Sequence, residues 1–492
     1  MTDARAGGAV LHDTHSVSVV APAAEDEAAA EAGLVGEAPP SPAGPIGAAE
    51  AASLPAPPTV AQPRALQTLR FNQRQIQFVF RARRELGEVF EMNGVIPGGP
   101  VITSHPDHVR SLFTAKPEDA PSLTGESPLR PILGPNSVLT ATGPRHMRQR
   151  KLLLPPFHGE AIEQYTQMIA EAAEREIDTW PTGEPFALAP RMQAITLDVI
   201  MAGIFGIEGT PRRGTSEHRL RTTIRRLTNA STLPTAQIGE LMNIGRDEAI
   251  GPMRLAIQIL DRATYPIIEE RRRVADLENR RDILSLLLRA RTEEGEAMDD
   301  KELRDELLTL VLAGHETTAN SLAWAWERLV RTPDAHERLR EAVRSGEDAA
   351  ETVEATIVEA MRARPVIPMI GRRVMRPWRL GDYAVPADTP VAMSILLVHH
   401  REDLYPEPFE FRPERFVGGR KPGTYEWIPF GGGIRRCLGA ALAMAEQRVV
   451  LEAMARRLDL EAAEPEPERA LHRNVTMIPS RGARVVVRSR KG

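Results

Sequence analysis

The chain has 492 residues, of which 42% are hydrophobic and 26% charged, so it has enough apolar side chains to bury a sizeable core. Its net charge of −5 argues against a strongly basic nucleic-acid binder and against a strongly acidic solvating protein. The single cysteine, Cys437, excludes an internal disulfide and zinc sites built on several cysteines. Because neither a long apolar run nor a secretory signal pattern occurs, we expect a soluble, cytoplasmic protein with no membrane anchor.

Residues 1–63 differ in composition from the rest of the chain. They are rich in Ala, Pro and Glu, they carry eight acidic residues against one basic residue, and the first aromatic residue after them is Phe71. Such a segment has little apolar surface to bury, so we expect a disordered tail over 1–63. Removal of this tail leaves a slightly basic body over 64–492.

The remaining pattern predicts a mainly helical protein with a small, late β portion. No alternation of strands and helices occurs, which argues against a nucleotide-binding Rossmann domain. In chain order, helical spacing or basic helical character is found at 73–90, 145–153, 159–180, 186–207, 248–292, 300–330, 335–345, 349–363 and 438–457, and strand patterns at 97–103, 372–395 and 475–488.

The segment around Cys437 reads Phe-Gly-Gly-Gly-Ile-Arg-Arg-Cys-Leu-Gly over 430–439. A glycine-rich loop thus delivers the cysteine to the first turn of a helix, where unpaired backbone N–H groups and the helix dipole favour a thiolate. A buried inert cysteine would not explain the glycines. A nucleophilic cysteine would need a histidine that folding brings from elsewhere. The third alternative is a thiolate ligand to haem iron.

This segment resembles the Phe-x-x-Gly-x-Arg-x-Cys-x-Gly signature of the cytochrome P450 family, with every fixed position filled. The resemblance implies a P450-like fold over 64–492, with haem b between the long central helix and the helix that follows the cysteine. It also implies that Cys437 is the axial iron ligand, that Phe430 and Gly439 lie beside the sulfur and the haem, and that Arg435 contacts a haem propionate.

The long helix at 300–330 contains a second motif of the family, Ala-Gly-His-Glu-Thr-Thr over 313–318. By the resemblance, Ala313 and Gly314 leave room for O2 where the helix unwinds slightly. Glu316 and Thr317 would be the acid and alcohol that deliver protons to the bound oxygen.

Two further sets of residues follow from the resemblance. The first is a structural ion-pair network that locks the cysteine loop, formed by Glu359, Arg362 and Arg415. The second set binds the haem propionates and comprises His146, Arg150 and Arg373, with Arg372 as the alternative to Arg373.

Taken together, the motifs predict a monooxygenase that hydroxylates or epoxidises a lipophilic substrate, such as a terpenoid or a fatty acid. The chain has no Gly-x-Gly-x-x-Gly loop and no flavin-sized addition, so a separate ferredoxin and ferredoxin reductase should supply electrons to a monomeric enzyme. A cationic docking surface for the ferredoxin would comprise Arg148, Lys151, Arg420, Lys421 and Arg436. The expected substrate pocket comprises the 118–142 loop and Leu310, Ala313, Val366, Ile367, Met369, Ile370, Met477 and Ile478.

Three alternatives remain open at this point. A haem-thiolate peroxygenase or an isomerase acting on a peroxide often lacks the acid–alcohol pair, which this chain has. A non-catalytic haem-binding protein would not need that pair. A thiol-dependent hydrolase or transferase without haem would require the motif matches to be accidental.

Overall fold

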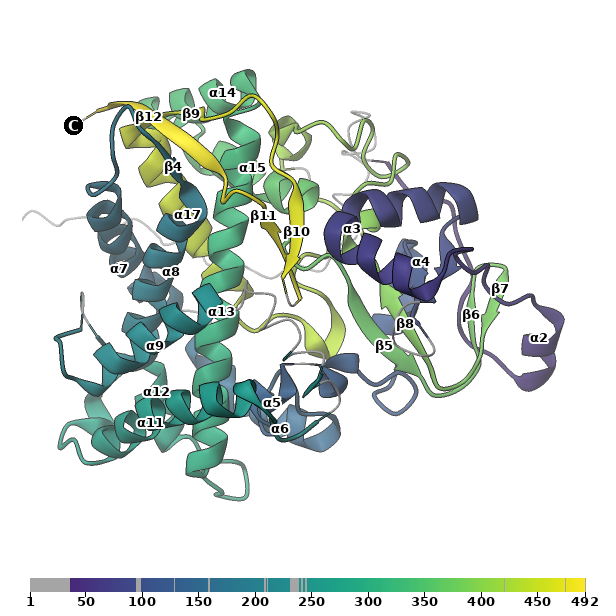
Figure 1. Ribbon diagram of the computed structural model, residues 1–492, viewed down its shortest axis with the longest axis horizontal. Coiled ribbons are helices and arrows are strands. Elements are labelled where there is room, and N and C mark those ends of the chain that lie inside the picture. The colour runs from purple at the N-terminus through teal and green to yellow at the C-terminus, as the bar shows by residue number, and fades with distance from the viewer. Residues whose placement is uncertain are drawn as a thin grey trace, which may run out of the picture.

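A computed structural model describes residues 36–93, 99–127, 129–157, 160–207, 209, 211–230, 239, 242–243, 246–419, 421–473 and 475–491. The prediction of a mainly helical protein with a small β portion is confirmed (Figure 1). The helices are α2 (Ala48–Ser53), α3 (Arg64–Leu86), α4 (Pro106–Phe113), α5 (Arg130–Leu133), α6 (Gly143–Leu153), α7 (Glu160–Ile177), α8 (Leu188–Phe205), α9 (Ser216–Ala230), α11 (Pro252–Arg272), α12 (Ile283–Arg289), α13 (Asp300–Leu329), α14 (Pro333–Ser345), α15 (Ala349–Ala363), α16 (Ile395–Val398) and α17 (Ala440–Arg457).

The strands form small sheets, most of them at the edge of the helical body. One sheet has the order β2-β3-β8-β5, a second β1-β6-β7, a third β4-β12-β9, and β10 pairs with β11. The strands are β1 (Ala43–Pro45), β2 (Val89–Glu91), β3 (Val101–Thr103), β4 (Pro185–Ala187), β5 (Ile370–Val374), β6 (Trp378–Leu380), β7 (Tyr383–Val385), β8 (Thr389–Met393), β9 (Leu458–Ala462), β10 (Ala470–Arg473), β11 (Thr476–Pro479) and β12 (Arg484–Arg490).

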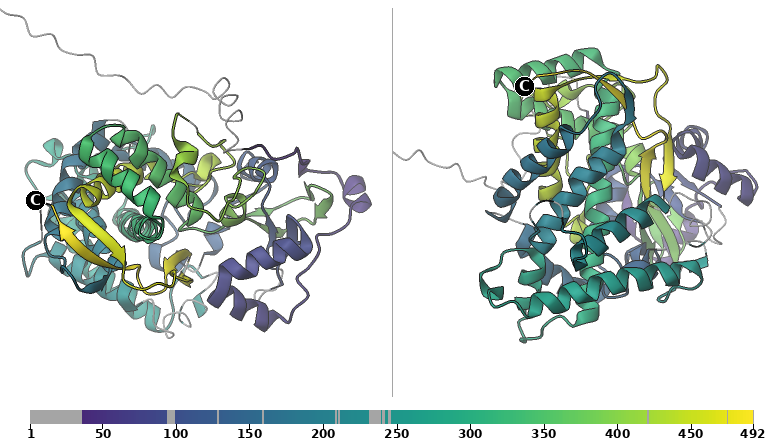
Figure 2. Two further views of the ribbon diagram at one scale, coloured as in Figure 1. Left: turned by 90° about the horizontal axis from the view of Figure 1, so that it is seen from above. Right: turned by 60° about the vertical axis from the view of Figure 1, so that its left-hand side comes forward.

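Helix α13 is the central element, and α7, α8 and α9 lie on one side of it while β5, β8 and α3 lie on the other (Figures 1 and 2). It begins at a capping box in which the Asp299 side chain accepts from the Glu302 N–H and the Glu302 side chain accepts from the Asp299 N–H. Its apolar side chains join one large buried cluster with those of α8, α15 and α17. This packing fixes the position of α13 in the core.

Among the residues that the structure describes, α8 is the one helix long and apolar enough to cross a membrane by composition. However, 72% of it is buried inside the protein, against α13 and α7. Its hydrophobicity is therefore accounted for by core packing.

The expected disordered tail divides into two parts. Residues 1–35 lie outside the described residues, but 36–63 are ordered, so the expectation was wrong for this part. Here β1 pairs antiparallel with β6, the Gly36 N–H donates to the Leu404 carbonyl, and the Ala384 N–H donates to the Pro55 carbonyl. The composition of 36–63 did not indicate this order, because most of the attachment is made by hydrogen bonds to residues far away in the sequence.

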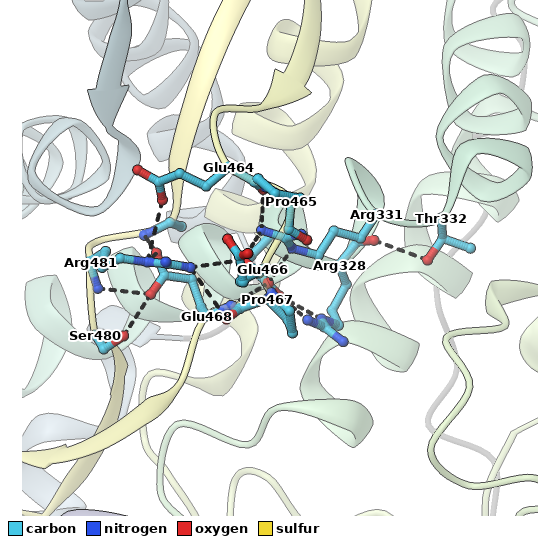
Figure 3. Close-up of polar contacts among 12 residues, drawn as sticks. Arg328, Arg331, Thr332, Glu464, Pro465, Glu466, Pro467, Glu468, Ser480 and Arg481 are labelled. Carbon is cyan, nitrogen blue, oxygen red and sulfur yellow. Dashed lines mark hydrogen bonds and ion pairs between the residues drawn. The ribbon is translucent and has the colours of Figure 1, made fainter.

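Charged contacts fix the loop between β9 and β10 to the end of α13 (Figure 3). The Arg331 guanidinium donates to the carbonyls of Glu464, Pro465 and Glu466. The Glu468 carboxylate accepts from the Ser480 hydroxyl and from the Arg481 N–H. The β10–β11 hairpin is therefore anchored at its base, and its tip lies beside the middle of α13.

Candidate active site

The loop before Cys437 is shaped by its glycines. Gly431 and Gly433 have φ angles of 66° and 62°, which side-chain-bearing residues rarely adopt. A Cβ atom on Gly433 would lie 2.2 Å from the Phe113 carbonyl oxygen, and one on Gly432 would lie 2.1 Å from the Phe113 ring. These glycines let the chain cross α4 closely, and the Cys437 N–H then donates to the Phe430 carbonyl at 2.9 Å.

Cys437 lies on the wall of an internal cavity of about 1420 Å³, together with Phe430 and Gly439. Burial raises the pKa of the Cys437 thiol, whereas the Gly439 N–H, Arg150 and Arg436 act in the opposite direction. A Cβ atom on Gly439 would meet no atom within 4 Å, so the space beside it is open to a bulky group.

Basic side chains from three separate elements converge on this cavity. They are His146 and Arg150 of α6, Arg372 of β5, and Arg435 of the cysteine loop. No carboxylate among the described residues forms a salt bridge with the three arginines. Within these residues, their hydrogen bonds all go to carbonyl oxygens: Arg435 donates to Val138 and Ala141, Arg150 to Arg436, and Arg372 to Gly371. The Arg372 guanidinium also lies over the Phe113 ring, 5.8 Å from its centroid.

Because their charges are buried without a counter-charge, these groups have lowered pKa values. Burial lowers the pKa of Arg372 to about 10. Burial, together with Arg372 and Arg150, lowers the pKa of Arg435 to about 10. Burial and the three arginines lower the pKa of His146 to about 4, so this imidazole is neutral at pH 7. A ligand with two anionic groups would relieve the repulsion within the cluster.

The predicted propionate contact Arg373 faces away from this cluster. Its guanidinium donates to both Glu126 oxygens, at 3.0 and 2.7 Å, and to the Asp388 carbonyl at 2.9 Å. Successive residues of a strand point to opposite faces, so Arg372 is the arginine that joins His146, Arg150 and Arg435. The geometry therefore favours Arg372, the alternative, over Arg373 as the arginine of this basic cluster.

Helix α13 presents Ala313, Glu316 and Thr317 to the same cavity. The helix is continuous here rather than unwound, and the Thr317 hydroxyl donates to the Ala313 carbonyl at 2.6 Å. Gly314 has a packing role, since a Cβ atom at this position would lie 2.7 Å from Cδ1 of Ile200 in α8.

Glu316 has partners that the sequence did not reveal. Its Oε1 atom accepts from Arg473 Nε at 2.9 Å and Nη2 at 2.5 Å, and from the Thr476 hydroxyl at 3.3 Å. Both partners belong to the β10–β11 hairpin, and Arg473 is buried. They follow Glu316 by more than 150 residues, so no local spacing could indicate this pairing.

The predicted network of Glu359, Arg362 and Arg415 is present, and all three side chains are fully buried. Arg362 donates to both Glu359 oxygens at 2.6 and 2.8 Å, and Arg415 Nε lies 3.6 Å from Glu359 Oε1. Arg362 also donates to the His399 carbonyl, and the His399 ring accepts from the Ile428 N–H. The network thus reaches the start of the cysteine loop.

Most of the residues that were predicted to form the substrate pocket line the cavity. Leu310, Ala313, Val366, Ile367, Met369 and Ile370 line the cavity. Met477 and Ile478 do not, because Met477 is buried in a separate cluster and its backbone pairs with Val366 and Trp324. Their neighbours Val475 and Thr476 line it instead. Sequence reasoning missed the contributions of α8, α9 and α11, which include Ile200, Ile204, Ile224 and Leu260.

The predicted docking surface is partly neutralised. Arg148 pairs with Glu302 at 2.8 Å, and Lys151 pairs with Glu293 at 3.1 Å. Arg420 lies outside the described residues, and Lys421 and Arg436 are exposed.

These features fit a haem. A thiol, open space beside Gly439 and a cluster of basic groups without carboxylate partners meet in one cavity. Among the described residues, no group of three or more His, Cys, Asp or Glu side chains could hold a metal ion directly.

Comparisons with known proteins agree with this geometry. The family model described as cytochrome P450 matches residues 55–487. Cytochrome P450 137 of Mycobacterium tuberculosis is 37% identical over 408 residues, which cover 83% of this chain and 84% of that protein. Cytochrome P450 138 of Mycobacterium bovis is 37% identical over 435 residues, or 88% of this chain and 96% of that protein.

Solved structures show the same fold. Retinoic acid bound cyanobacterial CYP120A1 matches with a TM-score of 0.73 and 24% identity, over 89% of this chain and 100% of that chain. The cytochrome P450DA heme domain matches with a TM-score of 0.73 and 22% identity, over 89% of this chain and 98% of that chain.

Proposed function

Because the chain belongs to the cytochrome P450 family, whose cofactor is haem, we propose that it is a monooxygenase that hydroxylates or epoxidises a lipophilic small molecule. One observation carries the proposal: the Cys437 thiol and the Ala313–Thr317 stretch of α13 line the same cavity, which is otherwise mostly aliphatic. When bound, haem supplies the iron that activates O2 and accepts electrons.

The residues of the chain divide into those that hold the cofactor and those that handle protons. Cys437 would be the thiolate ligand, and Arg150, Arg372 and Arg435 would pair with the propionates, with neutral His146 beside them. In the same cavity, Thr317 carries a hydroxyl and Glu316 a carboxylate. Three donors occupy Oε1 of Glu316, which leaves Oε2 to exchange a proton with water or with Thr317. The aliphatic walls exclude bulk water from the substrate.

We propose a ferredoxin and its reductase as the electron donors. Lys421 and Arg436 are the exposed cations that support a docking surface near the cysteine loop, because Arg148 and Lys151 already have carboxylate partners.

Two measurements on the haem-loaded protein test this function. The reduced, CO-bound protein should show the strongly red-shifted Soret band of thiolate ligation, and Cys437→Ser should lose it. Turnover should require O2 with ferredoxin and its reductase. Absence of the red-shifted band would overturn the haem-thiolate assignment, and product formation with peroxide alone would replace the monooxygenase with a peroxygenase.

A further inference from the structure

The sequence left open whether the substrate is a terpenoid or a fatty acid. The charged residues that line the cavity favour one of these two classes. Much of the cavity is walled by aliphatic side chains of α8, α9, α11, α13 and the segment after α15, including Ile204, Ile224, Ile257, Leu310, Val366 and Ile367. A terpenoid hydrocarbon and a fatty acid would both fill such a space. They differ in whether a carboxylate must be accommodated.

Five arginines line the cavity in the described part of the chain, and the proposed function or a carboxylate partner accounts for all but one of them, Arg436. Arg150, Arg372 and Arg435 lie on the haem side, and Arg436 lies next to Cys437. Arg373 is the remaining one, and its guanidinium is held by Glu126 and Asp388. No lysine lines the cavity in these ranges, and outside them the sequence contains only two arginines, Arg5 and Arg420, and no lysine.

The edge of the cavity at Arg373 carries excess negative charge. The side chains of Glu126 and Asp388 are 54% and 78% exposed while lining the cavity, so this part of the lining faces solvent. Glu91 also lines the cavity, and its carboxylate accepts from the Thr59 hydroxyl at 3.1 Å. We name Glu91, Glu126, Asp388 and Arg373 the rim; it holds three carboxylates against one guanidinium.

The binding free energy of a lipophilic carboxylate would be unfavourable in both parts of this cavity. At the rim it would be repelled by the excess negative charge. In the aliphatic part it would lose hydration without gaining a cation or a cluster of donors, and an unpaired buried charge is costly. An uncharged lipophile is not repelled at the rim and has no charge to desolvate, and it buries the same apolar surface.

We propose that the substrate is an uncharged aliphatic lipophile, such as a hydrocarbon or an alcohol, and that the rim carboxylates exclude lipophilic acids by occupying Arg373. This inference rests on the proposed function for the location of the substrate. The selection operates at binding, so it is measured without turnover.

The test compares ligands of equal chain length on the haem-loaded protein at about pH 7.5. Dodecanol and methyl dodecanoate are compared with dodecanoate, and abietinol with abietic acid. Binding is measured by the change in haem absorption and, independently of the haem, by equilibrium dialysis. The uncharged ligand of a set should bind about tenfold or more tightly than its acid, which corresponds to about 1.4 kcal/mol. An acid that binds as tightly as its uncharged analogue, or a failure of all the uncharged ligands to bind, would overturn the proposal.

Rim variants test the cause. Glu126→Gln with Asp388→Asn should free Arg373 and strengthen dodecanoate binding about tenfold, with little change for dodecanol. Glu118→Gln with Glu341→Gln is the matched control, because it also removes two negative charges, both residues are exposed, and neither lines the cavity. Equal gains in the rim variant and the control would show that overall charge, and not Arg373, sets the preference. The CO spectrum of each variant separates this outcome from failure of the proposed function itself.

Discussion

At the scale of single residues, the main addition to the site is Arg473, the buried guanidinium that holds Oε1 of Glu316. Hydrogen bonds from an arginine fix the orientation of a carboxylate. Arg473 does not line the cavity, whereas Glu316 does, so Arg473 would act through Glu316 as a positioning residue.

We predict that Arg473→Gln lowers the fraction of consumed O2 that appears as product, by about tenfold, with a similar loss in turnover. Arg473→Lys should recover part of both. Glu316→Gln should show at least as large a loss, and the combined variant should be no worse than Glu316→Gln alone, because residues that act as one unit are not additive. Product yield per O2 is the measurement.

The control is Arg469→Gln, since Arg469 is exposed just before β10 and is not near Glu316 in the hydrogen-bond network. Fully additive losses in the combined variant would contradict a positioning role and would indicate that Arg473 merely supports the hairpin.

The adjacent arginines of β5 provide a second prediction at this scale. Arg372 faces the basic cluster, and Arg373 is tied to Glu126, so Arg372→Leu should accelerate haem loss and Arg373→Leu should not. A charge-assisted hydrogen bond contributes about 1.5–3 kcal/mol, so the rate of haem transfer to an acceptor apoprotein should rise about tenfold or more for Arg372→Leu. The reverse order would restore Arg373 as the haem contact.

At the scale of elements, two buried histidines fasten the ordered N-terminal segment, residues 36–45. His105 contacts the Pro39 carbonyl at 2.8 Å, and the His108 ring lies between the Thr103 and Ser41 hydroxyls, at 2.6 and 2.9 Å. Burial, His105 and Arg401 lower the pKa of His108 to about 3, and burial and Arg401 lower the pKa of His105. The His108 ring is therefore neutral in the folded protein down to about pH 4, and the His105 ring is neutral at pH 7.

Acid should detach this segment before it unfolds the body. When the segment is released, each histidine can bind a proton below its ordinary pKa of about 6.5, whereas the packed His108 ring cannot until about pH 3. The attachment of residues 36–45 is therefore most stable above about pH 6.5, and it weakens as the pH falls from there towards 3. Between about pH 7.5 and 5.5 we expect the free energy of opening residues 36–45 to fall by about 1 kcal/mol because of His108, and His105 adds a loss of the same sign. Hydrogen exchange, corrected for intrinsic rates, measures it.

The double variant His105→Gln/His108→Gln should remove this pH dependence. Helix α8, which contains no histidine, provides the internal control. An opening free energy of 36–45 that is the same at both pH values in the native sequence would contradict the prediction.

The sequence predicted those features whose interacting residues lie close together in the chain, and it missed those whose residues lie far apart. Motifs whose residues are close in sequence, such as the cysteine loop and the Glu359–Arg362 pair, were located correctly. Strand positions failed by one or two residues, as at Arg373 and Met477, because side chains alternate between faces and a short strand leaves the register undetermined. Arg473 could not be found, because only the folded hairpin brings it to Glu316.

At the scale of the whole molecule, the buried network of Glu359, Arg362 and Arg415 links α15 to the loop that precedes Cys437. Glu359 also accepts from the Arg412 N–H at 2.7 Å, and Arg362 donates to the carbonyls of His399 and Pro408. The Trp427 indole donates to the Val358 carbonyl. Since these contacts come from one helix and from a loop of irregular backbone, the position of Cys437 depends on a few buried charges.

We therefore predict that Glu359→Gln destabilises the haem-loaded protein by about 3–5 kcal/mol, because it leaves two buried guanidinium groups without their carboxylate. Urea unfolding followed by far-UV circular dichroism measures the loss, and haem content after purification should fall with it. Glu414→Gln is the matched control: Glu414 pairs with Arg338 at 3.1 Å on the surface, where an ion pair contributes no more than about 1 kcal/mol. Equal effects of the two substitutions would mean that the buried network does not hold the cysteine loop in place, and that backbone contacts such as Trp427 to Val358 suffice.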